Sequence, residues 1–97
     1  MMLTNLTYLR FSIFAFLLIS LTGCEPRTAD DYNRRGVAWF AEGDNEKAVA
    51  DFTKAIRIDP ELAEVYKQRG LAYEKLGSSD QARRDLQKAE QLEAIAD

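Results

Sequence analysis

Residues 29–62 read ADDYNRRGVAWFAEGDNEKAVADFTKAIRIDPEL, and residues 63–96 read AEVYKQRGLAYEKLGSSDQARRDLQKAEQLEAIA. Laid over one another, these stretches agree at ten positions, whereas about two agreements would be expected by chance at ordinary residue frequencies. The identical pairs are Ala29/Ala63, Tyr32/Tyr66, Arg35/Arg69, Gly36/Gly70, Ala38/Ala72, Gly43/Gly77, Ala48/Ala82, Asp51/Asp85, Lys54/Lys88 and Ala55/Ala89. Because the spacing is constant at 34 residues, the chain contains one structural unit in two tandem copies.

Each unit is predicted to fold into two helices. The first unit repeats the spacing i, i+4, i+7, i+8, which is typical of one helix face. That spacing is followed by Tyr32, Gly36, Trp39 and Phe40, and again by Ala48, Phe52, Ala55 and Ile56. Gly43 and Gly77 follow the first helix of each unit, where a residue with positive φ ends a helix easily. Asp59-Pro60 separates the units, and Thr28 with Asp31 fits a capping box. We therefore expect four antiparallel helices of about 12 to 16 residues each.

The pattern resembles the tetratricopeptide repeat (TPR), a 34-residue helix-turn-helix unit with small residues at positions 8, 20 and 27 and a large aromatic residue at 11. These positions are Gly36, Ala48, Ala55 and Trp39 in the first unit, and Gly70, Ala82, Ala89 and Tyr73 in the second. The resemblance implies an all-α fold in which two TPR units, residues 29–62 and 63–97, stack as a short right-handed α-solenoid. One departure is Ala94, which stands where the family pattern has a proline before a following unit.

The second unit carries the features of an array end. Val49 and Ile56 correspond to Arg83 and Glu90, so a face that is apolar inside the array becomes polar, as a terminal cap requires. Repeat arrays usually need about three units for stability. A core of two units is therefore thin, and an alternative is that another copy of the chain completes it.

Two charged pairs recur in both units. Arg35 with Asp51, and Arg69 with Asp85, each span the two helices of one unit, although helix periodicity requires none of the four residues. We predict that each pair forms an interhelical ion pair. The alternative is that all four side chains are solvated and contribute roughly 0 to 1 kcal/mol.

The residues before the repeats have the layout of a secretory signal peptide. Arg10 precedes the uncharged run FSIFAFLLISL (11–21), which is short for a membrane-spanning helix. Leu21-Thr22-Gly23-Cys24 then resembles the lipobox of bacterial lipoproteins. The resemblance implies removal of residues 1–23, a lipid on Cys24 (diacylglycerol, with palmitate among the acyl chains) and a tether over residues 24–28. The alternatives are an uncleaved anchor, or a free thiol behind an ordinary signal peptide.

The location and charge follow from this interpretation. Because Glu25 rather than aspartate follows Cys24, the resemblance favours the outer membrane, facing the periplasm, in a Gram-negative host. The mature chain would have 12 basic and 16 acidic residues, a net charge of −4, which argues against a nucleic-acid partner.

The composition offers little for catalysis. There is no histidine, so the commonest general base and metal ligand is missing, and no ligand spacing or phosphate-binding glycine loop is present. We expect no enzyme activity, catalytic residue, metal or cofactor. The leading hypothesis is a membrane-anchored adaptor that binds a protein or peptide segment of the cell envelope. A self-associating structural envelope protein is the alternative, and an enzyme subunit or cryptic hydrolase is a third.

The resemblance also implies a binding surface. In the family, the first helices of successive units line a concave groove, and the corresponding residues here include Asn33, Val37, Phe40, Lys67, Leu71 and Lys75. Chaperone-binding members hold a terminal carboxylate with lysine at position 5 and asparagine at position 9, whereas this chain has Asn33 and Val37 there. The remaining apolar strip beside two lysines suits an extended or helical segment with apolar anchors and an acid. The alternative is that Phe40 and Val37 complete the core or pack on another copy.

Overall fold

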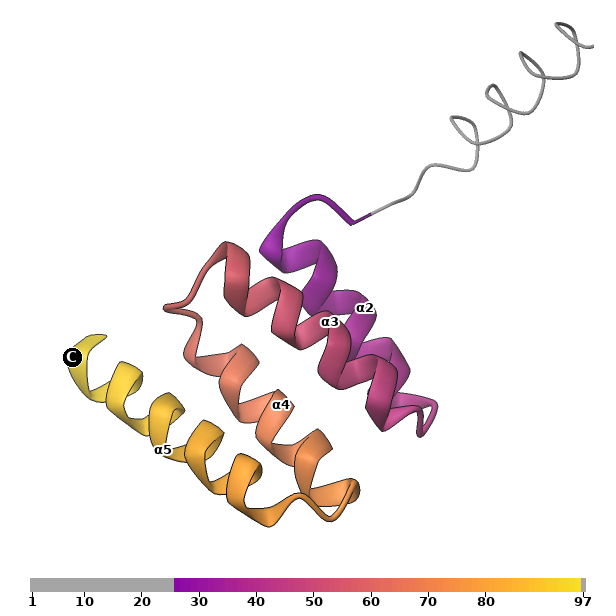
Figure 1. Cartoon of the computed structure of the whole chain (residues 1–97). Helices are drawn as coiled ribbons and strands as arrows, with labels where there is room; N and C mark the ends of the chain where they lie inside the picture. Colours follow the sequence, from indigo (N-terminus) through magenta and orange to yellow (C-terminus); the bar gives the residue numbers. More distant parts are fainter. Residues whose placement is uncertain (1–25, 97) are drawn as a thin grey trace, which may run out of the picture.

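The computed structural model describes residues 26–96, which form four helices and, within that range, no strand. The helices are α2 (Ala29–Ala41), α3 (Asn45–Ile58), α4 (Ala63–Lys75) and α5 (Ser79–Ala96), and successive helices run antiparallel (Figure 1). The sequence prediction of an all-α TPR solenoid built from two helix pairs is confirmed. The predicted signal peptide over residues 1–23 and Cys24 lie outside the described residues.

Local sequence explains where α2 and α3 begin and where α2 and α4 end. The Thr28 side chain accepts a hydrogen bond from the backbone N–H of Asp31, and the Asp31 carboxylate accepts one from the Thr28 N–H, which completes the predicted capping box. The Asp44 side chain caps α3 in a similar way. Gly43 and Gly77 adopt φ values of 85° and 80°, so both turns use the left-handed conformation that glycine tolerates best.

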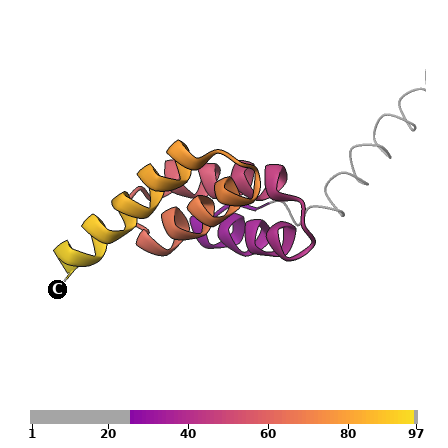
Figure 2. The same ribbon diagram turned by 90° about the horizontal axis from the view of Figure 1, so that it is seen from below.

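α5 is longer than expected. It contains 18 residues, whereas the sequence patterns predicted at most about 16. In the first unit, α3 ends just before Asp59-Pro60, but Glu93 and Ala94 occupy the equivalent positions in the second unit and are compatible with a continuing helix. Seen from below, the last turns of α5 project beyond the other helices (Figure 2).

The core joins the two units. Phe52 of α3 is fully buried, together with Ala48 and Ala55 of the same helix and Val65 and Ala72 of α4. Gly36 lies against the Phe52 ring so closely that an added Cβ would come within 2.6 Å of its Cε1 atom. The backbones of neighbouring helices can therefore come close together, because the residues around the large Phe52 ring are small.

Both ends of the two-unit stack are polar. At the position of buried Val65, the first unit carries Asp31, which is exposed and engaged in the helix cap. Arg83 and Glu90 of α5 are exposed, whereas their counterparts Val49 and Ile56 pack against the core. The predicted polar terminal face is confirmed. Within the described residues, the buried core lies between the helices of one chain.

Candidate protein-binding site

The predicted groove residues come from α2 and α4, the first helices of the two units. Figure 2 shows these helices on the lower side of the bundle, with α3 and the start of α5 on the upper side. Val37 and Leu71, which hold the same repeat position, are 41% and 40% exposed. Lys67 and Lys75 are also exposed. These four side chains are therefore available at the surface of one helix layer.

Phe40 has a different environment from the other predicted groove residues. It is half-buried and packs against the cluster that contains Phe52 and Val65. Phe40 therefore contributes to the core, as the alternative reading of the sequence proposed, while Val37 does not belong to that cluster. Any substitution of Phe40 would change packing as well as the surface.

Asn33 is half-buried, and its Oδ1 atom is buried without a hydrogen-bond partner. A buried carbonyl oxygen without a donor costs about 1 to 3 kcal/mol, so such groups usually have a structural or binding explanation. The sequence pattern placed Asn33 in the groove but gave no indication that its oxygen would lack a donor.

One bidentate ion pair in each unit joins the two helices of that unit. The Arg35 Nε and Nη2 atoms donate to the Asp51 carboxylate at 2.7 and 2.9 Å. The Arg69 Nε and Nη2 atoms donate to Asp85, both at 2.7 Å. The predicted interhelical ion pairs are therefore confirmed, and both aspartates are buried.

Arg69 also connects the two units. Its Nη1 atom donates to the Thr53 hydroxyl of α3 at 3.2 Å, and its guanidinium lies 5.8 and 5.7 Å from the ring centres of Tyr66 and Tyr73. The hydrogen bond to Asp85 raises the pKa of Arg69, although burial acts in the opposite direction. The guanidinium thus stays charged and fixes the orientation of α4 on α3.

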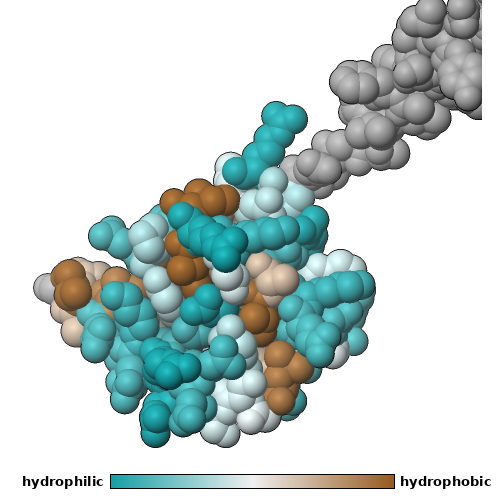
Figure 3. Space-filling model, viewed as in Figure 1, coloured by the Kyte–Doolittle hydropathy of each residue, from teal (hydrophilic) through white to brown (hydrophobic). Residues whose placement is uncertain are grey.

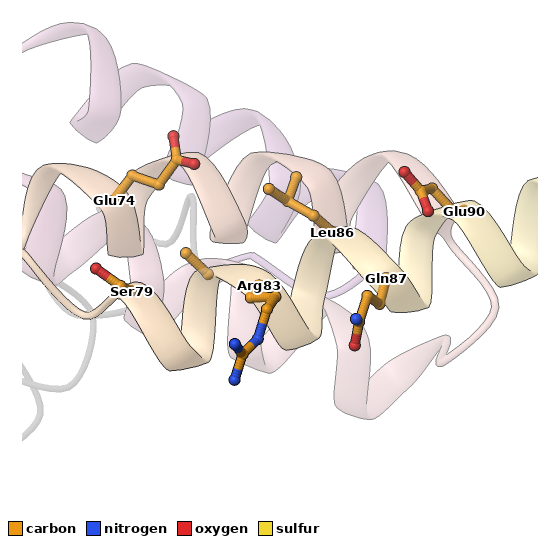
Figure 4. Close-up of a pocket in the computed structure, with 7 residues that line it drawn as sticks. Glu74, Ser79, Arg83, Leu86, Gln87 and Glu90 are labelled. Carbon is orange, nitrogen blue, oxygen red and sulfur yellow. The ribbon is translucent and has the colours of Figure 1, made fainter.

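A hollow of about 390 Å³ lies along α5, on the face where a third unit would pack. Figure 4 shows Leu86 between Glu74 and Glu90, with the Arg83 and Gln87 side chains directed away from Glu74. Its lining residues are Glu74, Ser79, Ala82, Arg83, Leu86, Gln87 and Glu90. The repeat alignment could have located this hollow, because it predicts where the next helix would dock, but its polar rim differs from the apolar face of α3.

The described residues were also searched for metal sites and membrane-spanning helices. No group of three or more metal-ligating side chains gathers within residues 26–96. Across the same range, no helix combines the length and the hydropathy that are needed to cross a membrane.

A pair of stacked helix hairpins with a polar face at each end defines a short helical-repeat protein. A family model described as "TPR repeat" matches residues 36–77, and another described as "Tetratricopeptide repeat" matches residues 63–95. The described part of the chain therefore consists of tetratricopeptide repeats, which are typically non-catalytic interaction modules.

Solved structures of MamA share this fold. One crystal structure of MamA is 34% identical over 70% of this chain, with a TM-score of 0.68. A second is 35% identical over 68% of the chain, with a TM-score of 0.64. The structure described as MamA MSR-1 C2 covers 98% of the chain at 24% identity and a TM-score of 0.72, which shows the fold alone. The chain spans 40%, 36% and 55% of these three proteins, respectively. A search of the curated proteins found no match.

Proposed function

We propose that this chain is a lipid-anchored, non-catalytic adaptor of the bacterial cell envelope, which binds a protein or peptide segment on the α2 and α4 side of its TPR module. The main support for the proposed binding surface is that Val37 and Leu71 are exposed at the same position of successive units. Apolar side chains repeated at one spacing on adjacent helices suit apolar anchors repeated along a bound segment.

The surrounding groups indicate the chemistry of the partner. Lys67 and Lys75 are exposed on the same helix as Leu71, which favours a segment that carries an acidic residue near its apolar anchors. We infer that the partner is an extended or helical segment with these features.

Self-association by continuing the repeat stack is less well supported. A second copy would bring its Asp31 to the place that Val65 occupies between the units, opposite a face that carries Arg83 and Glu90 where α3 has Val49 and Ile56. Such a contact would replace apolar packing by charged groups, and burying charges costs free energy even where they can pair. The described core is also closed within one chain, because Phe52, Ala55 and Ala72 are each fully buried.

The lipid anchor rests on the lipobox-like sequence, and one substitution tests it. The Cys24→Ser protein should lose acyl-chain labelling, and it should either stay uncleaved or leave the membrane fraction. In a Gram-negative host, the wild-type protein should fractionate with the outer membrane. Normal acylation and membrane retention in the variant would contradict the proposed anchor.

The binding surface is tested by charge substitutions at matched exposed positions. Val37→Glu and Leu71→Glu alter α2 and α4, while Ala50→Glu and Arg84→Glu alter equivalent exposed positions on α3 and α5. Surface substitutions usually change stability by less than about 0.5 kcal/mol, so all four proteins should unfold normally. We expect only the first two to lose their partner in pull-downs from detergent-solubilised envelope. Equal capture by all four variants would refute this binding surface.

A further inference from the structure

The two most exposed large apolar side chains of the described residues lie at one end of the helix bundle. Ile58, the last residue of α3, is 51% exposed, and Ile95, near the end of α5, is 81% exposed. Because successive helices are antiparallel, the ends of α3 and α5 lie on the same side as the start of α2 (Figure 1). We call this side, formed by residues 26–29, 57–63 and 92–96, the tether end.

The exposure at the tether end follows from the helix lengths. The last turns of α5 extend past its neighbours (Figure 2), so no other helix of the described chain covers Ile95. Figure 3 shows hydrophobic surface at this edge, near the ends of α3 and α5. Leu62 and Leu92 belong to the same end and are half-buried. The apolar side chains named here therefore come from two separate segments of the chain, residues 57–63 and 92–96.

The length of the tether limits which part of the protein can approach a membrane. Five residue steps separate Cys24 from Ala29, and at about 3.4 Å per residue they reach at most about 17 Å. α2 contains 13 residues, so it is about 20 Å long. If the opposite end, with the Gly43 and Gly77 turns, faced the bilayer, the tether would be too short to reach it.

The charges at the tether end favour an apolar contact over an electrostatic one. Arg27 and Arg57 are outnumbered by Asp59, Glu61 and Glu93, so this end has no attraction for anionic headgroups. Branched aliphatic side chains can still enter the boundary between headgroups and acyl chains, where burial of apolar surface is favourable.

We propose that the tether end inserts Ile58 and Ile95 into the surface of the same bilayer that holds the Cys24 lipid. This inference rests on the proposed lipid anchor and adds an orientation to it. The helix axes then point away from the membrane, and the side formed by α2 and α4 faces along the membrane surface. A partner segment would reach Val37 and Leu71 from beside the protein rather than from above it.

Fluorescent labels at three positions test this orientation in the full lipidated protein. Acylation consumes the thiol of Cys24, the only natural cysteine, so Ile58→Cys, Ile95→Cys or Leu76→Cys supplies a single reactive site. Leu76 is the control, because it is an exposed leucine beside the Gly77 turn at the opposite end. Each protein carries an environment-sensitive fluorophore and is reconstituted into phosphatidylcholine vesicles, with quencher placed either on the lipids or, as iodide, in the water.

We expect lipid-borne quencher to reduce the fluorescence at positions 58 and 95 several-fold more than at position 76, and iodide to show the reverse order. Raised salt should leave both results unchanged. If the protein is acylated and attached but all three labels are equally open to iodide, this inference fails while the proposed anchor stands. If Cys24 carries no lipid and the protein does not attach, both fail. Labels at 58 and 95 that are shielded from iodide yet not quenched by lipid would indicate contact between two copies, which also overturns the inference.

Discussion

The two interhelical ion pairs provide an internal comparison of how burial changes the cost of losing a charge. Replacing Asp85 or Asp51 with asparagine keeps the side-chain shape and removes the charge. The Arg69 side chain is only 17% exposed, whereas the Arg35 side chain is 43% exposed. Water can therefore hydrate Arg35 after the substitution far better than it can hydrate Arg69.

The expected magnitudes follow from this difference. Removing one partner of a buried pair costs about 3 to 5 kcal/mol, so Asp85→Asn should cost about 3 kcal/mol because the amide retains part of the hydrogen bonding. Asp51→Asn should cost about 1 to 2 kcal/mol, since its partner becomes solvated. For a domain of this size, a difference of 1 kcal/mol shifts the Tm by roughly 4 to 8 °C.

Chemical and thermal unfolding of both variants, followed by far-ultraviolet circular dichroism, measures these costs. A second substitution at the arginine completes a double-mutant cycle and separates the pair energy from packing effects. Equal losses for the two aspartates would refute the role assigned to burial. Losses below about 0.5 kcal/mol in both would mean that the pairs behave as ordinary surface charges.

Three further predictions concern packing and the first helix cap. Gly36→Ala should destabilise the protein by about 1 to 3 kcal/mol, because the new Cβ would lie 2.6 Å from the Phe52 ring, and denaturant unfolding should show a smaller loss for Gly70→Ala, whose closest contacts are 3.2 Å. Hydrogen bonds from the Thr28 side chain first, and then from the backbone N–H groups of Arg27 and Thr28, hold the pKa of Asp31 below 3.8. Because this pKa is lowered on folding, the cap stabilises the protein above pH 3.8 and loses that effect as the pH falls through the folded-state pKa. In thermal scans, the Thr28→Ala protein should therefore lose less stability on acidification than the wild type does. An equal loss in the two proteins would contradict this role of the cap. Phe40→Ala should lower the Tm more than Val37→Ala, since only Phe40 packs on the core cluster, and equal shifts would place Phe40 outside the core.

Most of the fold could be predicted because the same physical constraints occur twice in the sequence. A glycine opposite a large side chain, at a spacing of 16 residues in both units (Gly36/Phe52 and Gly70/Leu86), indicates two helices in close contact. The Arg–Asp pairs were predictable for a similar reason, because both recur where helix periodicity does not require them. The end of α5 was less predictable, since no proline or glycine stops the helix after Ala89.

The candidate site could be predicted only in part. Repeat position indicated which residues lie on α2 and α4, but it could not separate Val37, which is exposed, from Phe40, which packs on the core. That difference depends on how closely two helices approach, which is set by all of their packed side chains together. The burial of the Asn33 Oδ1 atom has the same origin.

Site-specific photo-crosslinking in living cells tests the central claim, that this TPR module binds an envelope protein on its α2 and α4 side. A photoreactive residue is placed at position 37 or 71, and at the matched exposed positions 50 or 84 on α3 and α5. The account predicts one discrete crosslinked envelope protein from positions 37 and 71, and no such product from positions 50 and 84. Crosslinks of equal yield from all four positions, or products from positions 37 and 71 that contain only a second copy of this chain, would contradict it.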